Sequence, residues 1–113
     1  MHSFEVRGGK KLNGEIVPQG AKNEALQIIS AVLLTPEKVT ITNIPDIVDV
    51  NLLIELLGDM HVKIERPQRD TCIFQADDID IDYLHGEAFK KKSGRLRGSV
   101  MLAGPLLARY QKA

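Results

Sequence analysis

The stretch Gly20-Ala21-Lys22-Asn23 marks the point where a short extended segment gives way to a long apolar helix pattern. Residues 21–34 are apolar at almost every position, which predicts a helix that is buried on most sides. Lys22 and Asn23 would then lie on its first turn, where free backbone N–H groups and the helix dipole favour anions. We expect these two residues to bind a phosphate or a carboxylate, although a solvated first-turn lysine would give the same pattern.

Two short strands are predicted before this helix. Phe4 to Arg7 alternates apolar and polar residues, and Leu12 to Val17, which Gly14 interrupts and Pro18 closes, is expected to form a second strand. A hairpin through residues 8–11 could join them, although no turn dipeptide there is decisive.

Downstream of the helix, strands and helices alternate, which predicts a mixed α/β (α+β) fold. The expected strands are Lys38–Thr42, Val62–Arg66 and Thr71–Gln75, with turns at Asn43–Pro45 and Pro67–Asp70 and an edge strand or loop at Asp77–Asp82. A helix is expected at Val48–Leu57, capped by Asp46 or Asp49 and ended by Gly58. Another is expected at Ser99–Arg109, where Gly104-Pro105 would kink it.

The first and last of these helices resemble each other. Lys22 precedes Ala25-Leu26 in the same way that Arg97 precedes Val100-Met101. The echo indicates one complete structural unit followed by the start of a second, so that the chain would stop in the middle of a unit.

Composition limits the classes of function. The chain has 113 residues, with 15 basic and 15 acidic side chains that cancel to a net charge of zero. Nothing in this balance favours nucleic acid or a membrane surface as a partner, and only 4% of the residues are aromatic. Cys72 is the single cysteine, and Met1 to Arg7 lacks the apolar core of a signal peptide, so we expect a soluble cytoplasmic protein.

Several other candidate sites fail when their spacing is examined. Residues 14–23 resemble a phosphate-binding P-loop, but Asn23 stands where a Ser or Thr would bind magnesium. A calcium loop that began at Asp77 would need Gly and Glu where Asp82 and Ala88 stand, so a solvated acidic edge is expected there and no metal. The basic stretch Lys90–Arg97 could contact nucleic acid, but a solvated, mobile loop entering a helix explains it better.

Several segments resemble one family, in order along nearly the whole chain. Gly20 to Leu26, Asn43-Ile44-Pro45, Asp49-Val50, Arg97-Gly98-Ser99 and Gly104 to Arg109 are similar to the N-terminal part of the enolpyruvyl transferases that act on UDP-N-acetylglucosamine. The related shikimate-pathway enzymes typically have serines where this chain has Ala21 and Asn23, which favours the UDP-sugar enzymes.

The resemblance implies a fold of two similar domains with the active site in the cleft between them. Each domain is built from βαβαββ units that form an inside-out α/β barrel. Residues 1–21 would be strands that pack with the other domain, and residues 22–113 would form part of the first domain, one unit plus the start of a second. The chain would then be an N-terminal fragment or a truncated form.

The implied reaction transfers the enolpyruvyl group of phosphoenolpyruvate to the 3-hydroxyl of UDP-N-acetylglucosamine, the first committed step of peptidoglycan synthesis. It proceeds by addition and elimination through a tetrahedral ketal, with no metal or organic cofactor. Fixed cations aimed at the developing charge would be the main catalytic contribution. Both substrates are small molecules.

Site residues follow from the resemblance position by position. Lys22 and Asn23 match the residues that contact phosphoenolpyruvate, Arg97 matches an arginine of the UDP-N-acetylglucosamine site, and Asp49 matches an acidic position near the cleft. Val48 departs from the pattern, because many relatives have a basic residue there.

The catalytic loop, with its Cys or Asp, would lie beyond Ala113, so no catalytic residue is expected within the chain and the fragment alone should be inactive. Two alternatives remain open, a non-catalytic module that binds anions or nucleotides and a structural fragment that self-associates through exposed apolar helices.

Overall fold

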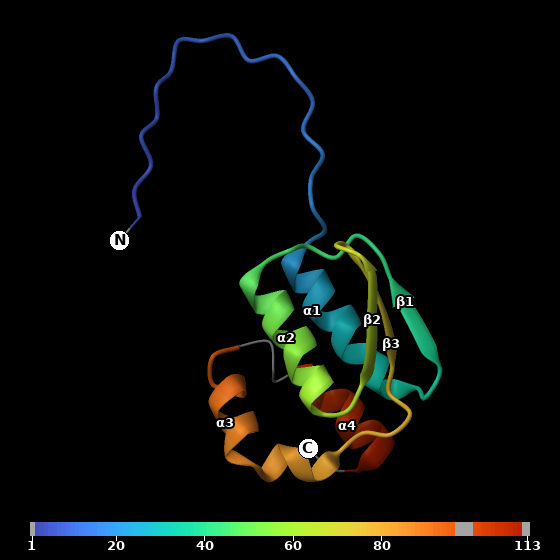
Figure 1. Cartoon of the computed structure of the whole chain (residues 1–113). Helices are drawn as coiled ribbons and strands as arrows, with labels where there is room; N and C mark the ends of the chain where they lie inside the picture. The colour runs from blue at the N-terminus through green and yellow to red at the C-terminus, as the bar shows by residue number, and fades with distance from the viewer. Residues whose placement is uncertain (1, 97–100, 112–113) are drawn as a thin grey trace.

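A layer of helices lies against one face of a three-stranded sheet, and an extended segment projects from the top of this body (Figure 1). The computed structural model describes residues 2–96 and 101–111. Residues 2–19, here called the N-terminal arm, contain no helix or strand. Phe4 and Leu12 are 96% and 95% exposed. The strands predicted at Phe4–Arg7 and Leu12–Val17 are therefore not formed, because no described segment lies beside them to accept their hydrogen bonds.

The predicted first helix is confirmed as α1, Lys22–Ala31, which continues into the 3₁₀ turn η1, Val32–Leu34. Its buried side chains include Ile29 and Leu33, each fully buried. Ile28 and Leu34 are 43% and 53% exposed, so the helix buries one face and not most sides as predicted. The apolar pattern overstated burial because it does not show which apolar positions find a neighbour.

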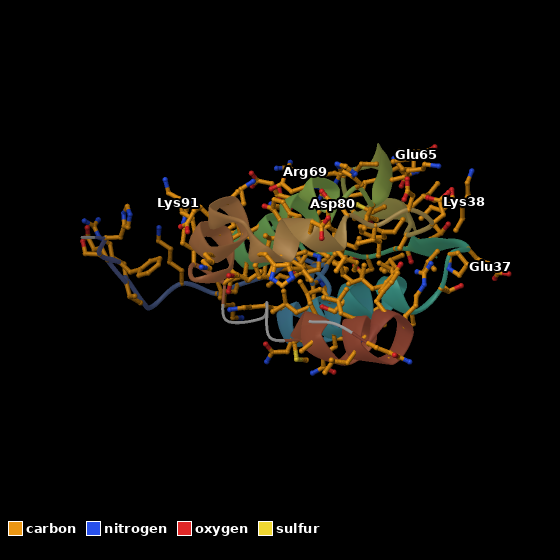
Figure 2. All side chains as sticks on the ribbon, turned by 90° about the horizontal axis from the view of Figure 1, so that it is seen from below. Glu37, Lys38, Glu65, Arg69, Asp80 and Lys91 are labelled. Carbon is orange, nitrogen blue, oxygen red and sulfur yellow. The ribbon has the colours of Figure 1, made fainter. Side chains whose placement is uncertain are left out.

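The sheet has the strand order β1-β3-β2, with both pairs antiparallel. The strands β1 (Lys38–Ile41), β2 (Lys63–Gln68) and β3 (Thr71–Gln75) confirm the predicted strands, and the turn between β2 and β3 is shorter than predicted. Cys72 and Phe74 of β3 are fully buried beneath the helices. The opposite face is polar, and Lys38 and Glu65 point away from the body (Figure 2).

The second helix, α2, runs over Val48–Asp59 and passes through Gly58, which was predicted to end it. It has no side-chain cap at its N-terminus. The predicted capping by Asp46 or Asp49 is therefore wrong, because both carboxylates bind other side chains. Helices α1 and α2 lie side by side, and their N-termini are at the end of the body from which the arm leaves (Figure 1).

The remaining elements are η2 (Ile81–His85), α3 (Glu87–Ser93) and α4 (Ala103–Tyr110). Helix α3 includes the first half of the basic stretch Lys90–Arg97, which was predicted to be a loop. Pro105 lies in the first turn of α4, where no intrahelical N–H bond is lost, so the predicted kink is replaced by a helix start. Arg109 of α4 donates to the carbonyl oxygens of Leu33, at 3.0 Å, and Ala76, at 2.7 Å, which ties the helix to the core.

The mixed α/β fold class is confirmed. After the arm, the order α1, β1, α2, β2, β3 reproduces the last five elements of the expected βαβαββ unit. The barrel and the second domain stay predictions. None of the helices within the described residues is long and apolar enough to cross a membrane.

Candidate anion site at the start of two helices

Gly20 brings the start of α1 against the segment that leads into α2. A Cβ atom at Gly20 would lie 2.0 Å from the carbonyl oxygen of Asn43, so only glycine allows this approach. Asn43 itself has a φ of 56°, a left-handed conformation that asparagine adopts more readily than most residues. The sequence between β1 and α2 is therefore folded tightly around Gly20.

A polar network holds the end of the arm at the same place. The backbone N–H of Asp46 donates to Gln19 Oε1 at 3.0 Å, and the Asp46 carboxylate accepts from Asn51 Nδ2 and Arg69 Nε, each at 2.9 Å. The hydrogen bond from Asn51, followed by that from Arg69, holds the pKa of the Asp46 carboxyl below its ordinary value. The sequence interpretation missed this network because its members come from four separate segments.

Lys22 and Asp49, two of the predicted site residues, meet across the starts of α1 and α2. Lys22 Nζ lies 2.7 Å from Asp49 Oδ2. Lys22 is the first residue of α1, and Asp49 is the second residue of α2. The two side chains are 52% and 36% exposed, so the ion pair is open to solvent and within reach of a dissolved anion.

The other predicted residues are less constrained. Asn23 follows Lys22 on the exposed first turn of α1. Val48, at the first position of α2, is 80% exposed beside Asp49, where a basic residue was expected from the resemblance. Arg97 lies outside the described residues, so its place relative to Lys22 stays a prediction.

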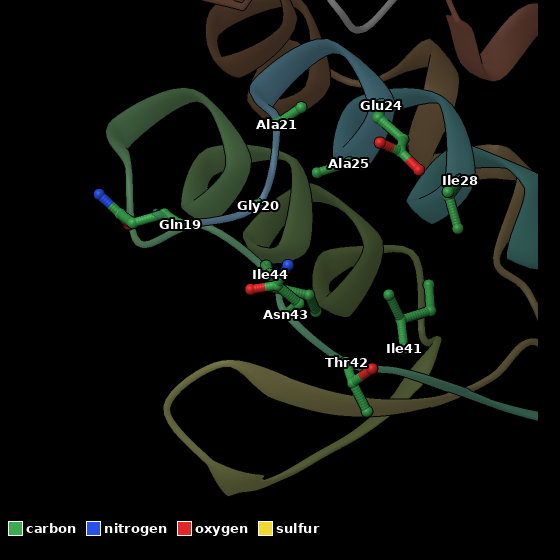
Figure 3. Close-up of a pocket in the computed structure, with 10 residues that line it drawn as sticks. All are labelled: Gln19, Gly20, Ala21, Glu24, Ala25, Ile28, Ile41, Thr42, Asn43 and Ile44. Atoms are coloured by element: carbon green, nitrogen blue, oxygen red, sulfur yellow. The ribbon is translucent and has the colours of Figure 1, made fainter. Parts of the chain in front are cut away.

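A hollow of about 320 Å³ lies between α1 and the segment after β1. Glu24 and Ile28 form one side, and Ile41 and Thr42 form the other (Figure 3). Lys22 and Asn23 are not among its lining residues. A larger, more open hollow of about 660 Å³ lies between the end of the arm and the β2–β3 turn, lined by Gln19, Asp46 and Arg69 among others. Neither hollow coincides with the Lys22–Asp49 pair.

Two further groups, Cys72 and Lys92, carry reactive or charged side chains inside the body of the chain. Cys72 is fully buried, and burial raises the pKa of its thiol, which disfavours the reactive thiolate. Lys92 binds Glu55 at 2.8 Å and also Asp59, to which the Tyr83 hydroxyl donates at 3.0 Å. This half-buried cluster joins α3 to α2. No group of three potential ligands within residues 2–96 and 101–111 is arranged to hold a metal ion.

Similarity to known proteins agrees with the sequence interpretation. The pattern of the family described as EPSP synthase (3-phosphoshikimate 1-carboxyvinyltransferase) matches residues 6–113. The UDP-N-acetylglucosamine 1-carboxyvinyltransferase of Porphyromonas gingivalis is 60% identical over 110 residues, which cover 97% of this chain and 25% of that protein. The enzyme of the same name from Bacteroides thetaiotaomicron is 56% identical over 113 residues, which cover 100% of this chain and 26% of that protein.

The fold comparison finds an enolpyruvyl transferase. The enolpyruvyl transferase NikO from Streptomyces tendae superposes with a TM-score of 0.70 at 26% identity, over 91% of this chain and 23% of that protein. The chain thus spans about a quarter of the length of the relatives that it matches. On the match of its sequence from residue 6 to residue 113, the chain belongs to the EPSP synthase family.

Proposed function

We propose that this chain is the N-terminal part of an enzyme that transfers the enolpyruvyl group of phosphoenolpyruvate to the 3-hydroxyl of UDP-N-acetylglucosamine and releases phosphate. The observation that carries the proposal is the 60% identity to the Porphyromonas gingivalis enzyme over 97% of this chain. Ala21 and Asn23 favour the UDP-sugar acceptor, because the related shikimate-pathway enzymes typically have serines at these positions.

The proposed roles of the site residues follow from the resemblance. Lys22 and Asn23 bind phosphoenolpyruvate, whose phosphate carries the charge that the Lys22 ammonium can neutralise. Asp49 lies next to the same substrate through its ion pair with Lys22. Arg97 contacts UDP-N-acetylglucosamine. The reaction proceeds through a tetrahedral ketal and uses no metal or organic cofactor.

The remaining catalytic groups of the enzyme lie on a loop segment and on a second domain, neither of which is part of residues 1–113. Residues 1–21 pack with the other domain of the enzyme, and residues 22–113 form one unit of the first domain plus the start of a second. The exposed apolar side chains of the arm support this division, since Val6 and Ile16 are 89% and 91% exposed. The chain by itself is inactive.

The product of this reaction is committed to peptidoglycan. The enzyme therefore acts in the cytoplasm, where its nucleotide-sugar substrate is made, and its activity supports cell-wall biogenesis, cell shape and division through the cell cycle. Its partners are the two small-molecule substrates, without nucleic acid or membrane.

A hybrid enzyme tests the proposed site. In this hybrid, residues 1–113 of this chain replace the matching N-terminal segment of the Porphyromonas gingivalis enzyme. Lys22→Ala should lower its UDP-N-acetylglucosamine-dependent release of phosphate by about 10²-fold, because one charged donor at the reacting phosphate is lost. Lys38→Ala removes the same charge from the outer face of the sheet and should leave the rate unchanged. An unaltered rate in Lys22→Ala would remove Lys22 from the site.

Self-association of the chain is the second candidate. Leu34 and Leu107 are each 53% exposed on neighbouring helical segments, and exposed apolar side chains favour association. Light scattering of the chain at several concentrations tests this candidate. A mass that stays at the 12.5 kDa of one chain would count against it.

A further inference from the structure

The ion pair at the start of α1 and α2 is unusual for an anion site, because the Asp49 carboxylate already pairs with the lysine that would bind the anion. Lys22 Nζ and Asp49 Oδ2 are 2.7 Å apart, which makes them a close ion pair. Together the two groups carry no net charge. A phosphate that approaches Lys22 therefore meets an ammonium whose field is largely cancelled by its neighbour.

Asp49 lies in the first turn of α2, where the helix dipole favours a carboxylate. It does not cap α2, which begins without a side-chain hydrogen bond at its N-terminus. The cap position is Ile47, and the residue between it and Asp49 is the exposed Val48, so no basic side chain neighbours Asp49 on this turn. The carboxylate is directed at Lys22, and the pair is exposed enough for both groups to be rearranged without opening the core.

We propose that Asp49 is the resident counter-ion of Lys22 and that it weakens the binding of phosphate at this lysine. The inference rests on the proposed function, in which Lys22 receives the phosphate group. An ammonium has three N–H donors, so Lys22 can hold Asp49 and an anion together. The carboxylate then orients the ammonium and at the same time repels the phosphate. In an enzyme that must release phosphate in every turnover, this repulsion shortens the time that the product stays bound.

The size of the effect follows from Coulomb attraction and repulsion near a surface. A carboxylate about 5 Å from a phosphate in a water-like medium weakens its binding by about three- to tenfold. Asp49→Asn removes the charge but keeps an oxygen that can accept from Lys22. Asp49→Glu keeps the charge. The two variants therefore separate electrostatic repulsion from the loss of a hydrogen-bond partner.

The test is a titration of the 113-residue chain with inorganic phosphate, followed through the backbone amide signals of Lys22 and Asn23 by NMR. Asp49→Asn should bind phosphate about three- to tenfold more tightly than the unmodified chain, and the gain should shrink as salt is raised. Asp49→Glu should resemble the unmodified chain. In a Lys22→Gln background phosphate binding at this site should be lost with or without Asp49→Asn, because the ammonium that receives the phosphate is gone.

Three results would overturn the inference. They are unchanged or weaker phosphate binding in Asp49→Asn, an equal gain in the Lys22→Gln background, and no phosphate binding by the unmodified chain. Its failure is distinguishable from failure of the proposed function. An active hybrid enzyme with no effect of Asp49→Asn refutes the counter-ion role alone, and an inactive hybrid with the expected titration refutes the enzymatic role alone.

Discussion

At Gly20 the backbone passes so close to Asn43 that the position of α1 requires a residue without a side chain. The carbonyl oxygen of Asn43 occupies the space that a Cβ would need, and Gln19, one residue earlier, is held by the backbone of Asp46. These contacts bring the starts of α1 and α2 together, so that Lys22 reaches Asp49. The geometry of the candidate site is therefore set by a residue with no side chain.

Gly20→Ala should destabilise the fold by at least about 1 kcal/mol, because the new methyl group must displace the Asn43 carbonyl or the arm. The free energy of unfolding in urea measures the effect. Gly104→Ala is the matched control, since nothing lies within 4 Å of its Cβ, and alanine in a helix should be neutral or slightly stabilising. Equal stability of the two variants would show that the close approach at Gly20 is not tight.

The pairing of Lys22 with Asp49 could not be predicted from the local pattern. Periodicity placed both residues near helix starts, and the resemblance assigned both to one cleft, but neither gives the distance between two helices. The same limit applies to Asp46. It was expected to cap α2, but its carboxylate binds Asn51 and Arg69. Short polar side chains near a helix start have several possible partners, and only the tertiary structure decides among them.

At the scale of elements, prediction succeeded where burial followed the periodicity. The alternating burial of β3, with Cys72 and Phe74 inside, agrees with a strand that has one buried face. It failed for α3, whose sequence is short and rich in lysine. That helix is held by contacts from elsewhere, including an edge-to-face contact of Phe89 with Tyr83 at 5.9 Å and the binding of Lys92 to α2. The strand prediction for the arm failed for the opposite reason. Its alternation indicates a strand, but no described strand lies beside it to pair with.

Helix α3 should loosen when Lys92 is removed. Lys92→Ala leaves Asp59 without its ammonium partner and should lower the urea midpoint of unfolding, whereas Lys91→Ala, at an exposed neighbouring position, should leave it unchanged. Tyr83 still donates to Asp59 in both variants, which keeps the comparison specific for the ion pair. A similar midpoint for the two variants would show that the cluster does not hold α3 in place.

The same ion pair makes the stability of the fold depend on pH, with a sign that follows from the two shifted pKa values. The hydrogen bond from Lys92 lowers the pKa of Asp59 from its ordinary 3.8, so the pair stabilises the fold above that pH and is lost as the pH falls through the lowered pKa. The pairing with Asp59, and then with Glu55, raises the pKa of Lys92 above 10.5, so its contribution is present below pH 10.5 and is lost as the pH rises through the raised pKa. The difference between the unmodified chain and Lys92→Ala should therefore be constant near neutral pH, begin to fall near pH 3.8 and vanish below the lowered pKa of Asp59. A difference that persists in strong acid would exclude the ion pair as its cause.

At the scale of the whole molecule, the arm dominates the shape. The radius of gyration is 17.1 Å, against about 13 Å for a compact domain of this length, and the longest dimension is 58 Å. The arm ends at Gln19, where it is fixed to the loop before α2. Its apolar residues are consistent with the proposed packing against another domain.

Deletion of residues 2–16 should separate folding from activity. These residues are exposed, so their removal should leave the urea midpoint of the chain unchanged. In the hybrid enzyme, the same deletion should abolish phosphate release, because the arm is proposed to join the two domains. A lower midpoint after the deletion would show that the arm stabilises this unit, and full activity of the shortened hybrid would contradict the proposed domain arrangement.

The most direct test of the central claim is the rate at which the hybrid enzyme releases phosphate from phosphoenolpyruvate. With UDP-N-acetylglucosamine present, the account predicts a kcat/KM within about tenfold of that of the unmodified Porphyromonas gingivalis enzyme, since the transplanted segment is 60% identical to the one it replaces. The isolated 113-residue chain should release none under the same conditions. A folded hybrid without UDP-N-acetylglucosamine-dependent release would contradict the claim that this chain is a working part of such an enzyme.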